Sequence, residues 1–272
     1  MAARHYENFP VGSILLPAKL RQPVALIYAF ARSADDFADE GTGRADERLY
    51  RLDRYARELD SIETGSEPDL PLFQALAPVI RRHALPVQLF RDLLSAFAQD
   101  VTRRRYETFD EVLDYCRRSA NPIGRLLLHL FGETGSHLLP RSDQVCSSLQ
   151  LINFLQDIEI DFAKGRIYIP LDEMARFGVS EGQIAGRDAG GGWRPLMGLQ
   201  IERARRMLDQ GAPLGEWLRG RIGLELRMIV LGGRRILHKL EASGGDVFRH
   251  RPLLKPLDWA WMLWRALAAY RP

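Results

Sequence analysis

Cysteine is scarce in this sequence: only Cys116 and Cys146 occur among 272 residues. The two show neither a pairing pattern nor the spacing of metal ligands, which argues against a disulfide framework and against a cysteine-ligated metal site. We therefore expect two unreactive thiols in a protein core. The low count also fits a reducing compartment such as the cytoplasm.

Long hydrophobic runs are missing as well. A helix that spans a bilayer needs about 20 consecutive apolar residues. Arg234 and Arg235 interrupt the best central candidate, and Lys255, Asp258 and Arg265 interrupt the C-terminal one. The first residues lack the charged, apolar and cleavage-site sequence of a signal peptide. The sequence predicts a cytoplasmic protein, either soluble or attached to a membrane surface.

Neither sign of charge dominates. Lys and Arg total 38 against 35 for Asp and Glu, a net charge of +3, and the longest block of like charge is residues 103–105. This balance is too mild to indicate a nucleic-acid partner. The hydrophobic share of 46% suits a globular protein of this length. Because no repeat of fixed period and no linker-like change in composition occurs, we expect one domain over residues 1–272.

Alternating strand patterns are nearly absent, and helical periodicity dominates, so the predicted fold class is all-α. A glycine-rich dinucleotide fingerprint on a βαβ unit is also missing, and we expect no nicotinamide cofactor. A short helix is expected after Pro170. The longer expected helices cover residues 23–40, 45–62, 70–83, 86–101, 109–118, 122–131, 142–163, 196–210 and 221–240.

The last part of the chain is rich in aromatic residues between basic ones. Its apolar members are Trp259, Trp261, Met262, Leu263, Trp264, Leu267 and Tyr270, and its basic flanks are Arg251, Lys255, Arg265 and Arg271. One interpretation is an interfacial segment in peripheral contact with a membrane. The other is a packed helix that closes an apolar cavity. The sequence leaves both open.

Two segments carry polar side chains in a narrow stripe on an otherwise apolar helix. At about 100° per residue, the first set falls within about 60° of arc and the second within about 80°. The remaining directions are mostly apolar, so both helices are expected to be buried. The first set is Tyr28, Arg32, Asp35 and Asp39, and the second is Gln150, Asn153, Asp157 and Asp161.

Buried carboxylates without partners would cost several kcal/mol each. Acidic side chains cannot neutralise one another at pH 7, so a cation is expected between the two rows. Mg²⁺ binds through one or two carboxylates together with water and substrate phosphates. The two rows therefore predict a site for Mg²⁺ and a diphosphate.

A metal of this kind assists the departure of diphosphate from an allylic substrate, and an apolar aromatic cavity protects the resulting carbocation from water. Arg32 can bind the diphosphate directly with its planar guanidinium, and Tyr28 can orient Arg32 or a phosphate oxygen. Lys164, Arg166 and Tyr168 follow the second row, where they suit the departing diphosphate. A solvated helix end is the alternative reading of these three residues.

The segments YAFARSADDFADE, RRRYETFDEVLDYC and QLINFLQDIEIDFAKGRIYIP resemble the squalene and phytoene synthase family of head-to-head prenyl transferases. The resemblance runs from about Asn8 to Pro170. It implies an all-α isoprenoid synthase bundle around a deep apolar cavity. It further implies Mg²⁺ binding by Asp35, Asp39, Asn153, Asp157 and Asp161 with Asp36 nearby, and substrate binding by Tyr28, Arg32, Gln150, Lys164, Arg166 and Tyr168.

Two segments depart from the usual family pattern. ENFPVGS, and YCRRSANPIGR in place of a Val-Ala-Gly turn, resemble the bacterial hydroxysqualene synthases of the route to squalene and hopanoids. This resemblance implies that presqualene diphosphate and water give hydroxysqualene and diphosphate, with Arg32, Tyr115, Asn121 and Tyr168 as catalytic residues. Asn121 is a candidate for positioning water, and the alternative is that it packs against and caps a helix break. Tyr106 and Asp100 are further candidates for proton transfer.

Two other functions stay open. The first is a related head-to-head reaction, in which farnesyl diphosphate is converted to presqualene diphosphate, squalene or phytoene. The second is a helical scaffold or lipid-binding protein without catalysis. The neighbouring enzymes of the squalene route are further candidate partners.

Overall fold

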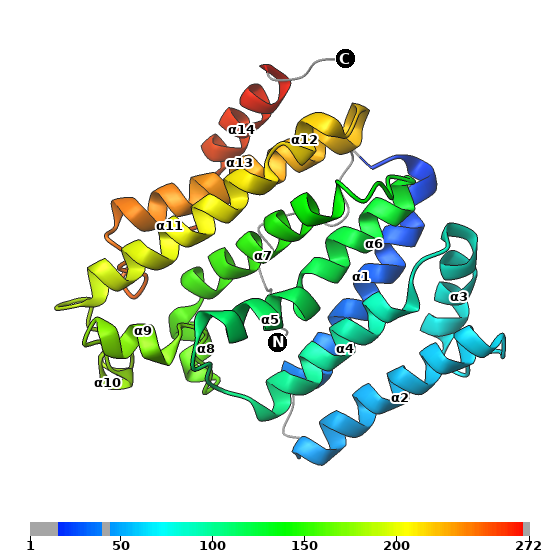
Figure 1. Ribbon diagram of the computed structural model, residues 1–272, viewed down its shortest axis with the longest axis horizontal. Coiled ribbons are helices and arrows are strands. Elements are labelled where there is room, and N and C mark those ends of the chain that lie inside the picture. The colour runs from blue at the N-terminus through cyan, green and yellow to red at the C-terminus, as the bar shows by residue number, and fades with distance from the viewer. Residues whose placement is uncertain (1–15, 40–43, 269–272) are drawn as a thin grey trace.

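The computed structural model describes residues 16–39 and 44–268, and within these ranges the regular structure is entirely helical (Figure 1). This confirms the predicted all-α class. The first helices are α1 (Ala18–Asp39), α2 (Ala45–Thr64), α3 (Pro71–His83), α4 (Val87–Thr102), α5 (Phe109–Ser119), α6 (Asn121–Phe131) and α7 (Leu139–Gln156). They are followed by α8 (Ile158–Ala163), α9 (Leu171–Arg176), α10 (Glu181–Ala185), α11 (Trp193–Gly211), α12 (Leu214–Trp217), α13 (Gly220–Ala242) and α14 (Pro256–Ala268).

The expected helix limits were wrong at two places that matter for the site. Helix α1 begins at Ala18 rather than near Pro23, because Leu16 and Leu20 are buried and extend the apolar stripe of Val24 by one turn. The predicted helix over residues 142–163 begins at Leu139 and is interrupted at Asp157, whose φ and ψ are −109° and 14°. The interruption separates α7 from α8 within the second polar row.

The buried side chains form two large hydrophobic clusters. The first lies among α1 to α4 and α6, where the rings of Tyr55, Phe73 and Phe90 surround that of Phe30 with centroids 5.1 to 5.8 Å away. The second lies around α7, α11 and α13, where the indole of Trp193 donates to the carbonyl of Gly245 at 2.9 Å. Helices α1 and α7, which carry the two polar rows, belong to different clusters.

Small residues bring two helices close to α7. A Cβ on Gly124 of α6 would lie 2.4 Å from Oγ of Ser142, and a Cβ on Gly211 of α11 would lie 2.8 Å from the carbonyl oxygen of Arg141. Both distances are too short for a real side chain, so glycine is required at these crossings. The close packing fixes α7, and with it the start of the second polar row.

Both cysteines are free thiols, as predicted, and burial raises the pKa of Cys116 and of Cys146 to about 12. No helix within the described ranges is long and apolar enough to cross a membrane.

Candidate active site

A cavity of about 880 Å³ is bounded by residues from both hydrophobic clusters. One part of its wall is polar, and most of the rest is apolar. Eleven of the residues predicted for the site line it, and these are Tyr28, Arg32, Asp35, Tyr115, Gln150, Asn153, Asp157, Asp161, Lys164, Arg166 and Tyr168. Segments that are far apart in sequence are therefore brought to one cavity.

The first polar row lies along α1. Arg32 is 3.7 Å from a carboxylate oxygen of Asp35 and 2.9 Å from one of Asp36. Asp36 is not among the residues lining the cavity, so its ion pair with Arg32 lies beside the site. Asp39 is the last residue of α1, and the structure does not describe its side chain. Among the side chains that the structure describes, the row within the cavity consists of Tyr28, Arg32 and Asp35.

The second polar row has an arginine partner that the sequence did not reveal. Nε of Arg251, in the segment between α13 and α14, donates to Oδ1 of Asp157 at 2.6 Å. Arg251 also lines the cavity. In the sequence, Arg251 is one of the basic residues that flank the C-terminal aromatic segment, and the chain folds back after α13 so that it reaches the start of α8.

The carboxylates are less buried than predicted. The side chains of Asp35 and Asp157 are 37% and 28% exposed, so the polar part of the cavity is open to solvent rather than dry. Arg32 and Arg251 supply positive charge that the prediction had assigned wholly to metal. Within residues 16–39 and 44–268, no three Asp, Glu, His or Cys side chains already converge as a metal cage.

The segment after α8 is held by backbone and guanidinium contacts from residues 104–106. The amide of Ile167 donates to the carbonyl of Arg104 at 3.0 Å, and Nη1 of Arg105 donates to the carbonyl of Gly165 at 2.6 Å. Gly165 has φ of 80°, which favours glycine and turns the chain after the helix. Arg166 is buried as a result and lines the cavity beside Lys164, so the alternative of a solvated helix end does not hold for it.

Tyr115, Tyr168, Phe154 and the buried Asp100 form the wall next to the second row. Asp100 accepts hydrogen bonds from the hydroxyls of Tyr115 at 2.5 Å and Tyr168 at 3.1 Å. Burial and the negative charge of Asp100 raise the pKa of Tyr115 and of Tyr168 well above the ordinary value of a phenol. The ring of Phe154 stacks on Tyr168 with centroids 3.8 Å apart. This wall offers aromatic faces together with one carboxylate.

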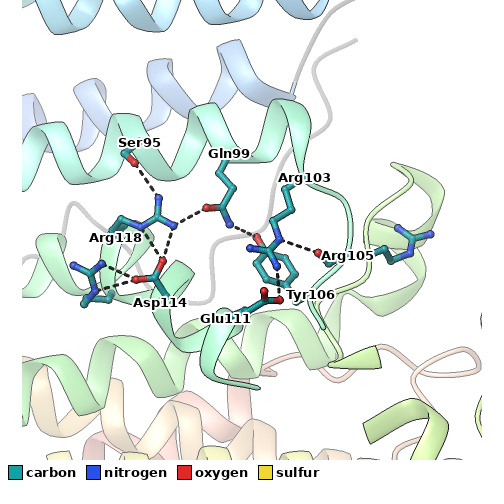
Figure 2. Close-up of polar contacts among 9 residues, drawn as sticks. Ser95, Gln99, Arg103, Arg105, Tyr106, Glu111, Asp114 and Arg118 are labelled. Atoms are coloured by element: carbon teal, nitrogen blue, oxygen red, sulfur yellow. Dashed lines mark hydrogen bonds and ion pairs between the residues drawn. The ribbon is translucent and has the colours of Figure 1, made fainter. Parts of the chain in front are cut away.

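Tyr106 packs behind this wall and ends a polar chain that leads to the surface. Nε2 of Gln99 donates to the hydroxyl of Tyr106 at 3.0 Å, and Arg118 donates to Oε1 of Gln99 at 2.6 Å (Figure 2). Arg118 also contacts Ser95 and Asp114. Tyr106 and Arg118 are not among the cavity-lining residues. This chain therefore buttresses the aromatic wall from outside.

Residues 117–122, where the chain departs from the family pattern, are not among the residues that line the cavity. Asn121 is buried, is not among the lining residues, and accepts a hydrogen bond from Oγ of Ser147 at 2.8 Å. The guanidinium of Arg117 pairs with Asp114 at the surface. The structure thus disagrees with the expectation that Asn121 positions water, because its side chain joins α6 to α7 instead. The segment ENFPVGS lies outside the described residues.

Arg251 and Asp100 contribute contacts to the site that no pattern in the sequence specifies. Arg251 shows no helical periodicity with the acidic rows, and only its place in a short basic run, Arg249 to Arg251, distinguishes it. Asp100 was a candidate without a stated partner. Its helical spacing from Leu93, Ala96 and Phe97 is the signal in the sequence for an inward-facing carboxylate.

Comparison with known proteins places these features in a family. The profile of the squalene/phytoene synthase family matches residues 2–258. The chain is 35% identical to a hydroxysqualene synthase of Sinorhizobium fredii over 260 residues, which cover 94% of this chain and 86% of that one. It is 31% identical to a phytoene synthase of Arthrospira platensis over 288 residues, which cover 100% and 91% respectively.

The fold agrees with this assignment. The crystal structure of a squalene synthase from Alicyclobacillus acidocaldarius superposes with a TM-score of 0.82 at 38% identity, covering 88% of this chain and 90% of the other. The two polar rows, the aromatic wall and the all-α cavity are thus found in a chain that belongs to the squalene/phytoene synthase family.

Proposed function

We propose that the protein is a hydroxysqualene synthase that converts presqualene diphosphate and water into hydroxysqualene and diphosphate. The observation that carries this proposal is that Asp35 and Asp157 line one largely apolar cavity, although their helices α1 and α7 pack into different hydrophobic clusters. One part of such a cavity suits a diphosphate, and the remainder suits a long hydrocarbon. Contributions from both clusters also favour one functional domain over the whole chain.

The polar residues fit Mg²⁺ as the cofactor. The cavity lining offers carboxylate and amide oxygens, the donor type that Mg²⁺ prefers, from Asp35, Asn153, Asp157 and Asp161. Asp39 is proposed as a further ligand. Among the described residues, no three acidic side chains converge in advance. This is compatible with Mg²⁺, because the ion is usually held by few carboxylates and completes its shell with water and phosphate. When bound, the ion would supply Lewis-acid neutralisation of the diphosphate oxygens.

The cationic residues of the cavity are proposed to bind the diphosphate. Arg32 and Arg166 present planar guanidinium groups, and Lys164 presents an ammonium group, in the lining of the same cavity as the carboxylates. Arg251 is a fourth cation there, and we add it to the proposed substrate-binding set. Tyr28 and Gln150 line the same region and are proposed to orient phosphate oxygens.

The aromatic wall is proposed to protect and guide the carbocation. Departure of diphosphate breaks a carbon–oxygen bond and leaves a cation, which the faces of Phe154 and Tyr168 can stabilise without attacking it. Addition of water forms a new carbon–oxygen bond and requires the loss of one proton. Asp100, bridged by the hydroxyls of Tyr115 and Tyr168, is proposed to accept that proton. Asn121 has no part in this step.

A second candidate is a head-to-head condensation of two prenyl diphosphates. The whole-length similarity to a phytoene synthase favours it, since such relatives share the family and the length of this chain. Both reactions begin with loss of diphosphate, so the polar end of the cavity does not distinguish them. The product decides between them.

The test is incubation of the pure protein with presqualene diphosphate and Mg²⁺ without NADPH. The proposal predicts release of diphosphate and formation of hydroxysqualene. Turnover of farnesyl diphosphate alone, with no reaction of presqualene diphosphate, would favour the condensing reaction. Absence of turnover with either substrate would leave a non-catalytic lipid-binding protein.

A further inference from the structure

Helix α14 has two apolar faces, and only one of them is packed against the protein. The inward face carries Met262 and Ala266, which are fully buried. At about 100° per residue, the outward residues fall within about 120° of arc on the opposite side. They are Leu257, Ala260, Trp261, Trp264, Leu267 and Ala268, and we call this set the α14 outer face.

The inward face is fixed to α13 by a buried carboxylate. Asp258 is bound by Arg235 at 2.6 Å, by the ammonium group of Lys239, and by the backbone amide of Lys255 at 2.7 Å. Burial would raise the pKa of Asp258, but the hydrogen bond from Lys239 and those from the Lys255 amide and Arg235 outweigh it and lower the pKa to about 2. The helix is thereby oriented, and its outer face must point away from α13.

The outer face is exposed to solvent along its whole length. Leu257 is 85% exposed and Trp264 is 64% exposed, and the side chains of Trp261 and Leu267 are also exposed. Figure 1 shows α14 at the edge of the bundle, with the other helices on one side of it. A contiguous apolar surface of this kind on a soluble protein indicates a binding partner.

The charges around this face indicate the chemistry of that partner. The guanidinium groups of Arg265 and Arg235 lie 5.8 and 5.9 Å from the ring centre of Trp261, and Lys255 is exposed at the helix start. The sole acidic residue of α14 is Asp258, which is buried and paired. Tryptophan prefers the interface between water and hydrocarbon, and basic residues favour anionic lipid headgroups.

We propose that the α14 outer face docks onto the surface of an anionic lipid bilayer, with Trp261 and Trp264 in the interfacial layer. A second copy of the chain suits the face less well. In a two-fold contact the face meets a copy of itself, and α14 offers no free acidic residue to pair with Arg265, because Asp258 is buried and bound. Lipid headgroups of negative charge supply such a partner.

Helix α13 connects the α14 outer face to the cavity, because it lines the cavity and also holds α14. The first half of α13 lines the cavity with Ile222, Leu226 and Ile229, while Arg235 and Lys239 in its second half hold α14. Docking through α14 therefore places the bilayer one helix away from the apolar wall of the cavity. A water-insoluble ligand would have a short path between the two.

Vesicle flotation of the full chain tests the proposal. The vesicles are phosphatidylcholine alone, or phosphatidylcholine with about 30% phosphatidylglycerol as the anionic lipid. The wild-type protein is expected to float with the anionic vesicles. The double variant Leu257→Ser/Trp264→Ser should bind at least about tenfold more weakly, because it loses apolar area from the face. Arg265→Gln should bind about fivefold more weakly, since one basic residue near the surface is lost.

Tyr50→Ser is the matched control, because Tyr50 is 62% exposed on α2, at the opposite edge of the bundle in Figure 1. It should bind vesicles like the wild type. If the double variant unfolds, Leu257→Ser alone and Arg265→Gln must still weaken binding, since both replaced side chains are exposed. No flotation of the wild type, or equal flotation of all variants, overturns the proposal. A dimer by light scattering that Trp264→Ser converts to a monomer, without vesicle binding, assigns the face to a second copy instead.

Discussion

Arg251 donates a hydrogen bond from Nε to Oδ1 of Asp157 over 2.6 Å, although the two residues are 94 positions apart in the chain. The contact joins the segment after α13 to the second acidic row. It places a cation against a carboxylate that is proposed to bind metal. We therefore expect Arg251 to weaken Mg²⁺ binding by competing for Asp157 and to strengthen diphosphate binding through its positive charge.

Replacing Arg251 separates these effects. Arg251→Gln should raise the KM for presqualene diphosphate by about tenfold, because a charge-assisted hydrogen bond is lost. Without substrate, the variant should bind Mg²⁺ at least as tightly as the wild type, since a cation that competes for Asp157 is removed. Diphosphate release and thermal shift with Mg²⁺ measure the two quantities. Arg249→Gln is the control, because Arg249 is exposed and pairs with Asp246. Weaker Mg²⁺ binding in Arg251→Gln would contradict this account.

Two asparagines provide a matched pair for the site. Asn121→Ala should leave the product spectrum unchanged and lower the free energy of unfolding by about 1 kcal/mol, because only the hydrogen bond to Ser147 is lost. Asn153→Ala should reduce turnover, because Asn153 lines the cavity beside the acidic row. Product analysis by chromatography and denaturant unfolding check both variants. A loss of hydroxylated product in Asn121→Ala alone would restore its role in positioning water.

The proposed proton acceptor can be tested through the product. Asp100→Asn should lower the share of hydroxysqualene among the products by at least about tenfold, because general-base assistance to water is lost. Tyr106→Phe is the control, since its hydroxyl is bound by Gln99 behind the wall and should not alter the product. An unchanged product share in Asp100→Asn would remove this residue from proton transfer.

The buried phenols and thiols predict a loss of stability at high pH. The pKa of Tyr106, Tyr115, Tyr168, Cys116 and Cys146 is raised in the folded state, chiefly by burial. The unfolded chain therefore releases protons first, and stability that is fully present below about pH 9 is lost as pH rises. Thermal unfolding should show a Tm that falls steeply between about pH 9 and 11. The fall should be smaller in Tyr106→Phe, and a Tm that is flat over this range would contradict the assignment.

The sequence was sufficient for the helices and for the two polar rows. Buried residues such as Phe30, Ala34 and Ala38 recur with helical period, and that period orients Arg32 and Asp35 as well. Family resemblance then added the functional class. These features are local, so they can be derived from neighbouring residues.

The features that could not be predicted depend on contacts between distant segments. Arg251 meets Asp157 only because the chain returns after α13, and no pattern in residues 249–255 indicates that return. For Asn121, the sequence allows a role in positioning water or a cap at a helix break, and it does not reveal the hydrogen bond with Ser147 of α7. For the C-terminal segment, the sequence left open a packed helix that closes an apolar cavity and an interfacial helix. The inward face of α14 packs against α13 without lining the cavity, and its outward face is exposed.

The most direct test of the central claim is diphosphate release from presqualene diphosphate by Asp35→Asn and Asp157→Asn over a titration of Mg²⁺. Both variants should lose at least about 100-fold in turnover, because each removes an anionic ligand for the ion that neutralises the leaving group. Their Tm should equal or exceed that of the wild type, and Glu159→Gln, on the exposed side of α8, should keep full activity. Turnover close to the wild type in either aspartate variant would contradict the claim that the two rows act together on the diphosphate.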